Sequence, residues 1–254
     1  MSRFVPYLTE KAIECNAVAL LAEYEHERGL TITPPIPIED IVEKHLKLGI
    51  EFDDTHTRFG VPRTSGSNLD ILGAIFGDGR IVIDESLDPE ENPAKEGRYR
   101  FTLAHESGHW QLHRQLIVPA TSQASVFDDA PDASFICRSN QAKKREEWQA
   151  DFYASCLLMP RKMIFASWNE MSPDEKQRIL GLYTRISQAS VEKRPTSCGA
   201  MGCLDLNETD DEALERFCRS FASRFQVSPI AMRIRLEKLG LLRCAVSHQQ
   251  LLTS

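Results

Sequence analysis

Apolar residues recur at intervals of three and four positions in several stretches of the chain, which is the spacing of one face of an α-helix. Residues 8–28 follow this spacing and are succeeded by Gly29, a residue typical of helix ends. A proline turn then leads into a short predicted helix from about residue 37 to 45. The helical spacing returns in residues 99–113, 146–159 and about 172–188. The pattern predicts a fold in which helices predominate.

Two shorter apolar runs have the length of strands. They are "ILGAIF" (residues 71–76) and "RIVID" (residues 80–84), and Gly77, Asp78 and Gly79 separate them. A short glycine-containing connection between two such runs predicts a β-hairpin. We therefore expect an α+β architecture in which a small strand layer packs against helices.

The C-terminal part reads as a separate helical element. Residues 195–203 contain Pro, Ser and Gly and interrupt the helical spacing, which predicts a boundary between a domain of residues 1–194 and an element of residues 204–254. Two helices are expected in that element around a tight turn at residues 226–227. Ser228 suits the N-cap of the second helix and Pro229 suits its first position. This arrangement resembles a helix-turn-helix.

Composition and charge narrow the possible functions. The net charge of −7 argues against a protein that mainly coats nucleic acid, because phosphate binding requires clustered Lys and Arg. No apolar run approaches the roughly 20 residues that span a bilayer, and the N-terminus lacks the apolar core of a signal peptide, so we expect no membrane association and a cytoplasmic location. The seven cysteines are scattered and odd in number, which favours reduced thiols over a disulfide framework.

Three of the seven histidines stand at four-residue intervals in "FTLAHESGHWQLH" (residues 101–113). On a helix, His105 and His109 project from the same face, where two imidazoles can bind one metal ion. Glu106 lies beside them and completes an H-E-x-x-H motif, in which the histidines bind zinc and the glutamate activates the attacking water. Gly108 is unfavourable inside a helix by ~1 kcal/mol, which close packing at this point would explain. The motif predicts a zinc hydrolase.

A catalytic zinc site needs a third protein ligand. His113 continues the same helical face but lies two turns from His105, so a helix-end role or a role behind the ligands is favoured for it. The better candidate is Glu147 in the next predicted helix, where Asp151 stands one turn further on. This pair resembles the gluzincin arrangement, in which the glutamate binds zinc and the later acid hydrogen-bonds a ligand histidine. Glu146 is a rival, although it faces about 100° away and has no acid one turn later.

The motifs together resemble the ImmA/IrrE family of bacterial metallopeptidases. The similarity rests on "RFTLAHESGHWQLH", on "EWQADFYASCLLMP" and on the tail "FASRFQVSPIAMRIRLEKLGLL", and it extends over nearly the whole chain. It implies a zincin-like core in which His105, His109 and Glu147 bind Zn²⁺ and Glu106 is the catalytic base. It also implies site-specific cleavage of a helix-turn-helix repressor, which would switch on a mobile-element or stress-response regulon.

Further expectations concern the substrate. Residues 80–84 are expected to form the edge strand that pairs with an extended peptide. The mixed segment 115–145 is longer than an ordinary connection and is expected to border the cleft from the other side. Tyr153 and Arg100 are both candidates to polarise the scissile carbonyl, and the sequence does not choose between them.

Two other hypotheses compete with a peptidase. Residues 216–243 carry a local net charge of +6, which would suit a DNA-binding regulator. DNA binding is nevertheless disfavoured, because "PIAMRIRLEKLGLL" is largely apolar and offers few side chains that could read bases. A zincin retained only as a partner-binding module is disfavoured by the presence of Glu106.

Overall fold

The computed structural model describes residues 5–61, 71–117, 135–138, 144–174, 176–177, 179–181, 183 and 210–242, with only the backbone for 135–138 and 210–217. The chain divides into two compact units. Unit 1 comprises Met1–Pro160 with Arg224–Val227, and unit 2 comprises Arg161–Ser223 with Ser228–Ser254. The predicted domain boundary at residues 195–203 lies outside the described residues. The mixed α+β class expected from the sequence is confirmed.

Unit 1 contains a four-stranded sheet in the order β1-β3-β2-β4. The predicted hairpin is confirmed, since β2 (Ile71–Ile75) and β3 (Arg80–Asp84) pair antiparallel. β1 (Gly49–Asp53) runs parallel to β3, and β4 (Phe135–Arg138) runs antiparallel to β2. The hairpin therefore occupies the centre of the sheet and the two unpredicted strands form its edges.

The expectation that residues 80–84 form an edge strand is wrong. β3 is hydrogen-bonded on both sides, and its last four residues, 81–84, are all buried. Such a continuous buried run is typical of an interior strand, whereas a strand with one solvated face alternates. The edges that an extended peptide could join are those of β1 and β4.

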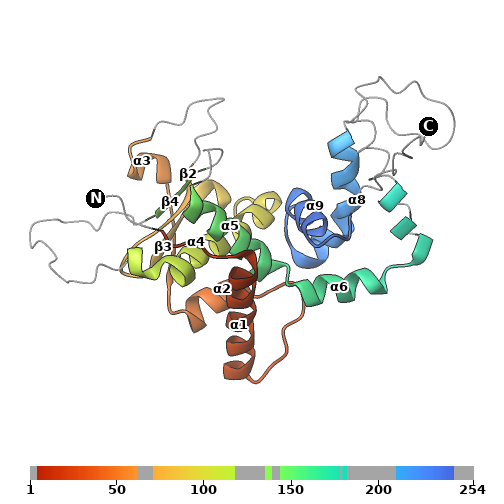
Figure 1. The fold of residues 1–254 in the computed structure, drawn as a ribbon. Helices are drawn as coiled ribbons and strands as arrows, with labels where there is room; N and C mark the ends of the chain where they lie inside the picture. Colours follow the sequence, from red (N-terminus) through yellow and green to blue (C-terminus); the bar gives the residue numbers. More distant parts are fainter. Residues whose placement is uncertain are drawn as a thin grey trace, which may run out of the picture. The chain divides into compact units, whose positions relative to one another are not determined.

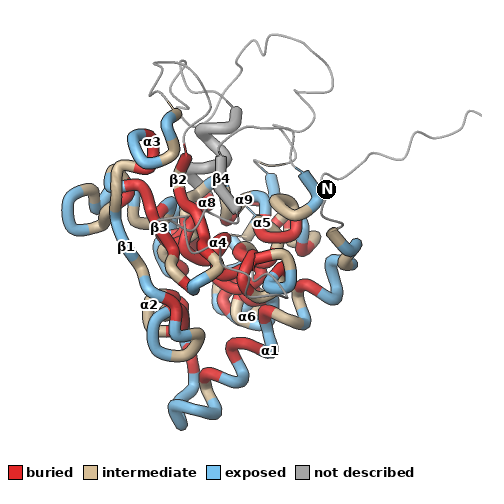
Figure 2. The backbone as a smooth tube through the Cα atoms, turned by 90° about the vertical axis from the view of Figure 1, so that its left-hand side faces the viewer, coloured by how far each residue is buried: buried red, intermediate tan, exposed pale blue. Residues whose placement is uncertain are grey.

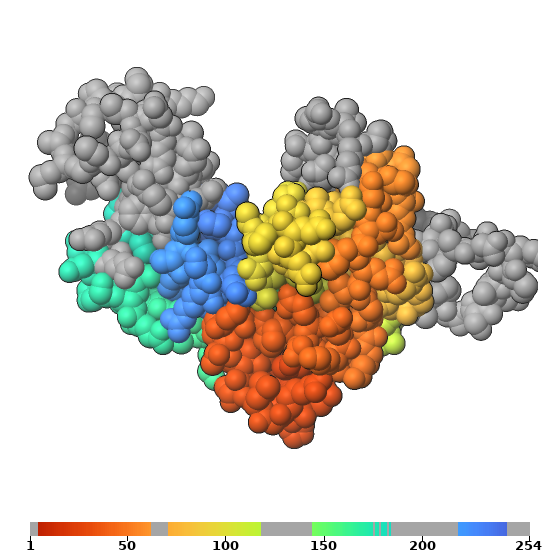
Figure 3. All heavy atoms as spheres, turned by 180° about the vertical axis from the view of Figure 1, so that it is seen from behind, coloured from red at the N-terminus to blue at the C-terminus, as the bar shows by residue number. Residues whose placement is uncertain are grey.

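α1 (Glu10–Arg28) ends at Gly29 as the sequence predicts, and it begins two residues after the predicted start. The Thr9 hydroxyl accepts a hydrogen bond from the amide of Ala12, and Gly29 closes the helix in the left-handed conformation with φ 63°. The next helix, α2 (Ile38–Asp40), continues directly into a π-helical turn at Ile41–His45, so the predicted short helix is confirmed but is wound more widely in its second half. Seen from behind, α1, α2 and the chain leading to β1 form one continuous surface in red and orange (Figure 3).

The centre of unit 1 is a pair of long helices, α4 (Glu96–Ile117) and α5 (Arg145–Leu158). α4 packs on β2 and β3 with one side and on α5 with another, and α5 in turn packs on α1 (Figure 1). α4 is consequently buried along most of its middle, as are β2 and β3, whereas α1 alternates between buried and exposed positions (Figure 2). A helix that follows the hairpin is thereby held rigidly between the sheet and a second helix.

The described part of unit 1 also contains the short helix α3 (Thr55–Arg58). Two 3₁₀ turns, Glu85–Leu87 and Pro93–Lys95, lie between β3 and α4.

Unit 2 contains α6 (Arg161–Glu170), most of α8 (Asp210–Phe225) and α9 (Pro229–Lys238). The predicted tight turn between the last two helices is confirmed, with Gln226 at φ 50° and the Ser228 hydroxyl accepting a hydrogen bond from the amide of Ala231. In the described part of the chain, no helix is long and apolar enough to cross a membrane.

Candidate metal centre

α4 and α5 bring the three predicted ligands together. The Nε2 atoms of His105 and His109 are 3.0 Å apart. Carboxylate oxygens of Glu147 lie 3.3 Å from Nε2 of His105 and 3.5 Å from Nε2 of His109. Both histidines are buried and Glu147 is partly exposed, so the group has one side open to solvent. Among the described residues, these three form the one cluster of metal-binding side chains.

The donor set suits a small cation. In a tetrahedral zinc site with bonds of 2.0–2.2 Å, neighbouring ligand atoms are about 3.3 Å apart, which is close to the distances observed here. Asp151 Oδ1 lies 2.9 Å from Nδ1 of His105. As the carboxylate can only accept, Nδ1 of His105 carries the proton and Nε2 presents its lone pair to the cluster.

His113 stands behind this group. Its Nδ1 atom lies 3.1 Å from Nδ1 of His109, on the side of that ring away from Glu147, and its Nε2 atom lies 2.8 Å from Oε1 of Gln149. The backbone of α4 departs from helical geometry at His113, with φ −123° and ψ 17°. The structure therefore places His113 next to a predicted ligand and outside the converging set.

Burial and charge act in opposite directions on these groups. Burial lowers the pKa of His109 to about 4, so this imidazole is neutral and free to bind a cation at neutral pH. Burial alone would raise the pKa of Glu147, but the adjacent imidazoles of His105 and His109 outweigh that effect and hold the pKa well below the usual range. The centre is accordingly a carboxylate facing imidazole lone pairs, a combination that favours a cation.

Glu106 differs from the other carboxylates. It is fully buried, and neither of its carboxylate oxygens has a hydrogen-bond partner among the described residues. Burial raises its pKa to about 8, although the charge of nearby His105 acts in the other direction. Unpaired buried carboxylates are rare in folded proteins and call for a functional explanation.

The space for Glu106 is provided by β2. A Cβ atom at Gly73 would lie 2.8 Å from Cγ2 of Thr102 and 3.0 Å from Oε1 of Glu106. Any larger residue at position 73 would displace the glutamate or push α4 off the sheet. Gly73 was not identified from the sequence, although a glycine inside a strand often marks such a close approach.

Gly108 has the packing role that the sequence suggested. A Cβ atom there would lie 3.0 Å from Cδ1 of Tyr153 and 3.3 Å from the carbonyl oxygen of Ala150. Its neighbours are thus residues of α5, the helix that carries Glu147. The absence of a side chain at position 108 lets α4 and α5, which carry the predicted ligands, approach each other closely.

The two candidates for polarising a carbonyl are both buried. Arg100 is 4% exposed and donates a hydrogen bond to the backbone carbonyl of Ile36, with Glu39 3.4 Å away. Tyr153 is fully buried, and its hydroxyl has no partner among the described residues. Burial raises the pKa of Tyr153, as does the charge of Glu23 on α1. The structure therefore gives Arg100 a structural role and places Tyr153 in the helix packing.

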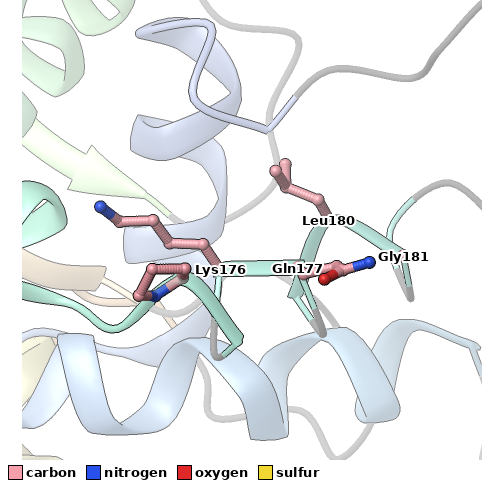
Figure 4. Close-up of a pocket in the computed structure, with 5 residues that line it drawn as sticks. Lys176, Gln177, Leu180 and Gly181 are labelled. Atoms are coloured by element: carbon pink, nitrogen blue, oxygen red, sulfur yellow. The ribbon is translucent and has the colours of Figure 1, made fainter.

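A pocket lies in unit 2 along one short helical stretch (Figure 4). It is lined by Pro173, Lys176, Gln177, Leu180 and Gly181. None of these residues offers a carboxylate, an imidazole or a thiol, so the pocket lacks the chemistry of the cluster in unit 1.

Comparison with known families agrees with the motif. A family model described as "Peptidase_M78: IrrE N-terminal-like domain" matches residues 54–196, which is more than half of the chain and includes the whole cluster. No curated protein matches the sequence.

Proposed function

The chain belongs to the ImmA/IrrE family of metallopeptidases, and on this basis we propose that it is a zinc-dependent endopeptidase whose metal is held by His105, His109 and Glu147. The observation that carries the proposal is the convergence of two imidazole nitrogens and a carboxylate within 4.8 Å of one another. Two histidines and a glutamate with one open position are the ligand set of many zinc hydrolases.

The proposed chemistry assigns a role to each neighbouring residue. A bound zinc ion supplies Lewis acidity, which acidifies water and polarises the scissile carbonyl. Glu106 takes the proton of the attacking water, because it lies next to His105 in sequence and its oxygens have no competing partner among the described residues. A nearby cation would lower its raised pKa and allow it to act as a base at neutral pH. Asp151 holds the ring of His105 in position.

The edge strand β4 is the proposed docking strand for a substrate peptide. It is hydrogen-bonded to β2, the strand whose Gly73 contacts Glu106, and it also contacts α4. A peptide added to β4 would extend the sheet by main-chain hydrogen bonds. β1, the other edge, is separated from β2 by β3. This assignment replaces the expected role of residues 80–84.

We propose that the substrate is a helix-turn-helix repressor cut at one exposed loop, with derepression of a mobile-element or stress-response regulon as the outcome. A folded partner would have to present an extended segment to a sheet edge, which favours cleavage at one place over general digestion. The proposal places the enzyme with its repressor in the cytoplasm.

A DNA-binding function of α8 and α9 is less well supported. α9 exposes Ile230 and Ile234, at 46% and 53%, one turn apart on the same face. Recognition helices present polar or charged side chains to bases at such positions. This face suits contact with a protein better than contact with DNA.

The test combines metal analysis with cleavage. Purified protein should contain about one zinc per chain, and the double variant His105→Ala/His109→Ala should contain none. Zinc-loaded protein incubated with the repressor encoded beside it should yield two fragments by mass spectrometry. Glu106→Gln should keep its zinc and cut more than about 100-fold more slowly, because general base catalysis is lost. A double variant with normal zinc content would disprove the metal site, and normal cleavage by Glu106→Gln would disprove the base.

A further inference from the structure

A chain of buried hydrogen bonds runs from His109 to the N-terminal segment. Nδ1 of His109 lies 3.1 Å from Nδ1 of His113, and Nε2 of His113 lies 2.8 Å from Oε1 of Gln149. The amide nitrogen of Gln149 then lies 3.0 Å from the backbone carbonyl oxygen of Pro6. His109 and Gln149 are fully buried and His113 is 2% exposed. Three elements far apart in the sequence, α4, α5 and the segment before α1, therefore meet in one polar path.

The donor and the acceptor of each of these hydrogen bonds follow from the last group in the series, the carbonyl of Pro6. The carbonyl oxygen of Pro6 can only accept, so the amide NH₂ of Gln149 donates to it and the amide oxygen of Gln149 faces His113. Since that oxygen can only accept, Nε2 of His113 carries the proton. A neutral imidazole has one N–H, so Nδ1 of His113 is a lone pair and accepts the N–H at Nδ1 of His109. Nε2 of His109 is left with its lone pair toward Glu147 and His105.

We propose that His113 and Gln149 are positioning residues that fix His109 in the tautomer able to bind the metal, an inference that rests on the proposed metal site. His105 is held by a different device, because its Nδ1–H donates directly to the carboxylate of Asp151. The carboxylate of Asp151 thus orients His105, whereas the uncharged side chains of His113 and Gln149, which end on the backbone carbonyl of Pro6, orient His109. Partners of this kind fix the ring and the tautomer of a metal ligand, and their loss weakens metal binding.

The N-terminal segment is held at this place by a second contact. The guanidinium of Arg145 donates a 3.0 Å hydrogen bond to the carbonyl oxygen of Val5, next to the Pro6 carbonyl that ends the chain. Both donors belong to α5, four residues apart and hence on one face of that helix. The residues before α1 are in this way part of the support of His109.

The experiment measures zinc affinity and the position of the proton separately. His113→Phe keeps a ring but removes both nitrogen atoms, and zinc affinity, measured by competition with a chelator, should fall by roughly 10–100-fold. His113→Gln should recover most of the affinity, because its amide oxygen can accept from His109 and its NH₂ can donate to Gln149. His45→Phe is the matched control, since His45 is a mostly buried histidine that contacts Glu27 away from the site, and its zinc affinity should not change.

The tautomer is read by long-range ¹⁵N–¹H spectra of the metal-free protein labelled at histidine. In the wild type His109 should carry its proton on Nδ1, and in His113→Phe it should show a mixture of both tautomers. Equal zinc affinity in the wild type and His113→Phe, or a His109 proton on Nε2 in the wild type, would overturn the inference. A wild-type protein that binds no zinc while its His109 is protonated on Nδ1 would instead disprove the proposed function and leave the positioning chain intact.

Discussion

At the scale of single residues, the feature that distinguishes this site is the contrast between two carboxylates. Glu147 lies against the imidazoles of His105 and His109, which lower its pKa and keep it ionised, whereas Glu106 is buried beside them with no partner among the described residues. The proposed ligand and the proposed base thus differ because their surroundings differ. Burying Glu106 without a partner lowers the stability of the folded protein, and the size of this effect depends on pH.

The metal-free protein should lose stability as the pH rises because of Glu106. Its pKa is about 8 in the folded protein and near the ordinary value of 4.5 when unfolded. Between these values the unfolded chain has released a proton that the folded protein retains, so the free energy of unfolding falls with increasing pH. Glu106→Gln removes this dependence on pH, because glutamine does not ionise. We expect the Tm of Glu106→Gln minus that of the wild type to increase by roughly 4–8 °C between pH 6 and pH 9. This increase corresponds to a change on the order of 2 kcal/mol in the difference between their free energies of unfolding.

Thermal unfolding after exhaustive treatment with a chelator measures this difference. Glu147→Gln provides the opposite control, because its carboxylate has a lowered pKa and its loss should destabilise the protein at neutral pH. A pH-independent difference between wild type and Glu106→Gln would show that Glu106 is not buried in an uncharged form.

At the scale of elements, the site depends on two glycines that allow three layers to touch. Gly73 lets β2 lie against Glu106, and Gly108 lets α5 lie against α4. One contact positions the proposed base, and the other positions the helix that carries the proposed third ligand. The two functions can therefore be damaged separately.

Gly73→Ala should impair catalysis while zinc remains bound. The new Cβ atom would lie 3.0 Å from the carboxylate of Glu106 and 2.8 Å from Thr102, which forces the proposed base to move, and the three atoms nearest to it belong to Thr102 and Glu106 and to no proposed ligand. We expect kcat on the repressor to fall at least about 10-fold, since small displacements of catalytic groups cost about this much or more.

The matched control is Gly49→Ala in β1, where the nearest atom to a new Cβ is Cγ of Arg80 at 3.9 Å. That variant should retain wild-type kcat and zinc content. Comparable losses in both variants would indicate a general effect of alanine in the sheet and would remove the special role of Gly73.

The sequence was informative where the spacing along one helix decides the geometry. His105 and His109 share a face because they are four residues apart, and Gly29 and Ser228 mark helix ends by local chemistry. It was uninformative where tertiary contacts decide. β1 is an edge strand whose residues are all partly or fully exposed, so it lacks the buried run that identified the hairpin. The sequence does not reveal β1 and β4, and without these two strands residues 80–84 resemble an edge strand.

The same limit applies within the site. Asp151 could be paired with a ligand histidine from its one-turn spacing to Glu147, but the chain from His113 through Gln149 to Pro6 joins residues up to 143 positions apart. No periodicity relates these positions. Only the packing of α5 between α4 and the N-terminal segment brings them together.

At the scale of the whole molecule, unit 1 carries the cluster on helices that also form its core. α4 contacts the sheet and α5, and α5 contacts α1. A ligand that binds only the folded form of such a core stabilises all of it.

Zinc should therefore raise the Tm of the protein. With free zinc at about 100 times its Kd, the gain is about 2.7 kcal/mol, which corresponds to roughly 5–10 °C for a chain of this size. The variant His105→Ala/His109→Ala should show no such shift, and addition of a chelator should reverse it in the wild type. Calorimetry with and without zinc makes the measurement. An equal shift in the variant would assign the stabilisation to some other zinc site.

The separation of the ligands along the chain has a further consequence. His109 and Glu147 are 38 residues apart, so an ion bound to both closes a long loop and restricts the unfolded chain much as a disulfide would. Without the ion, only the packing of α4 on α5 holds the two ends of that loop together. The abundance of the enzyme in a cell would then follow the supply of its metal, because starved molecules unfold more often and are removed by other proteases. The ion would set how long each molecule lasts as well as whether it can cut.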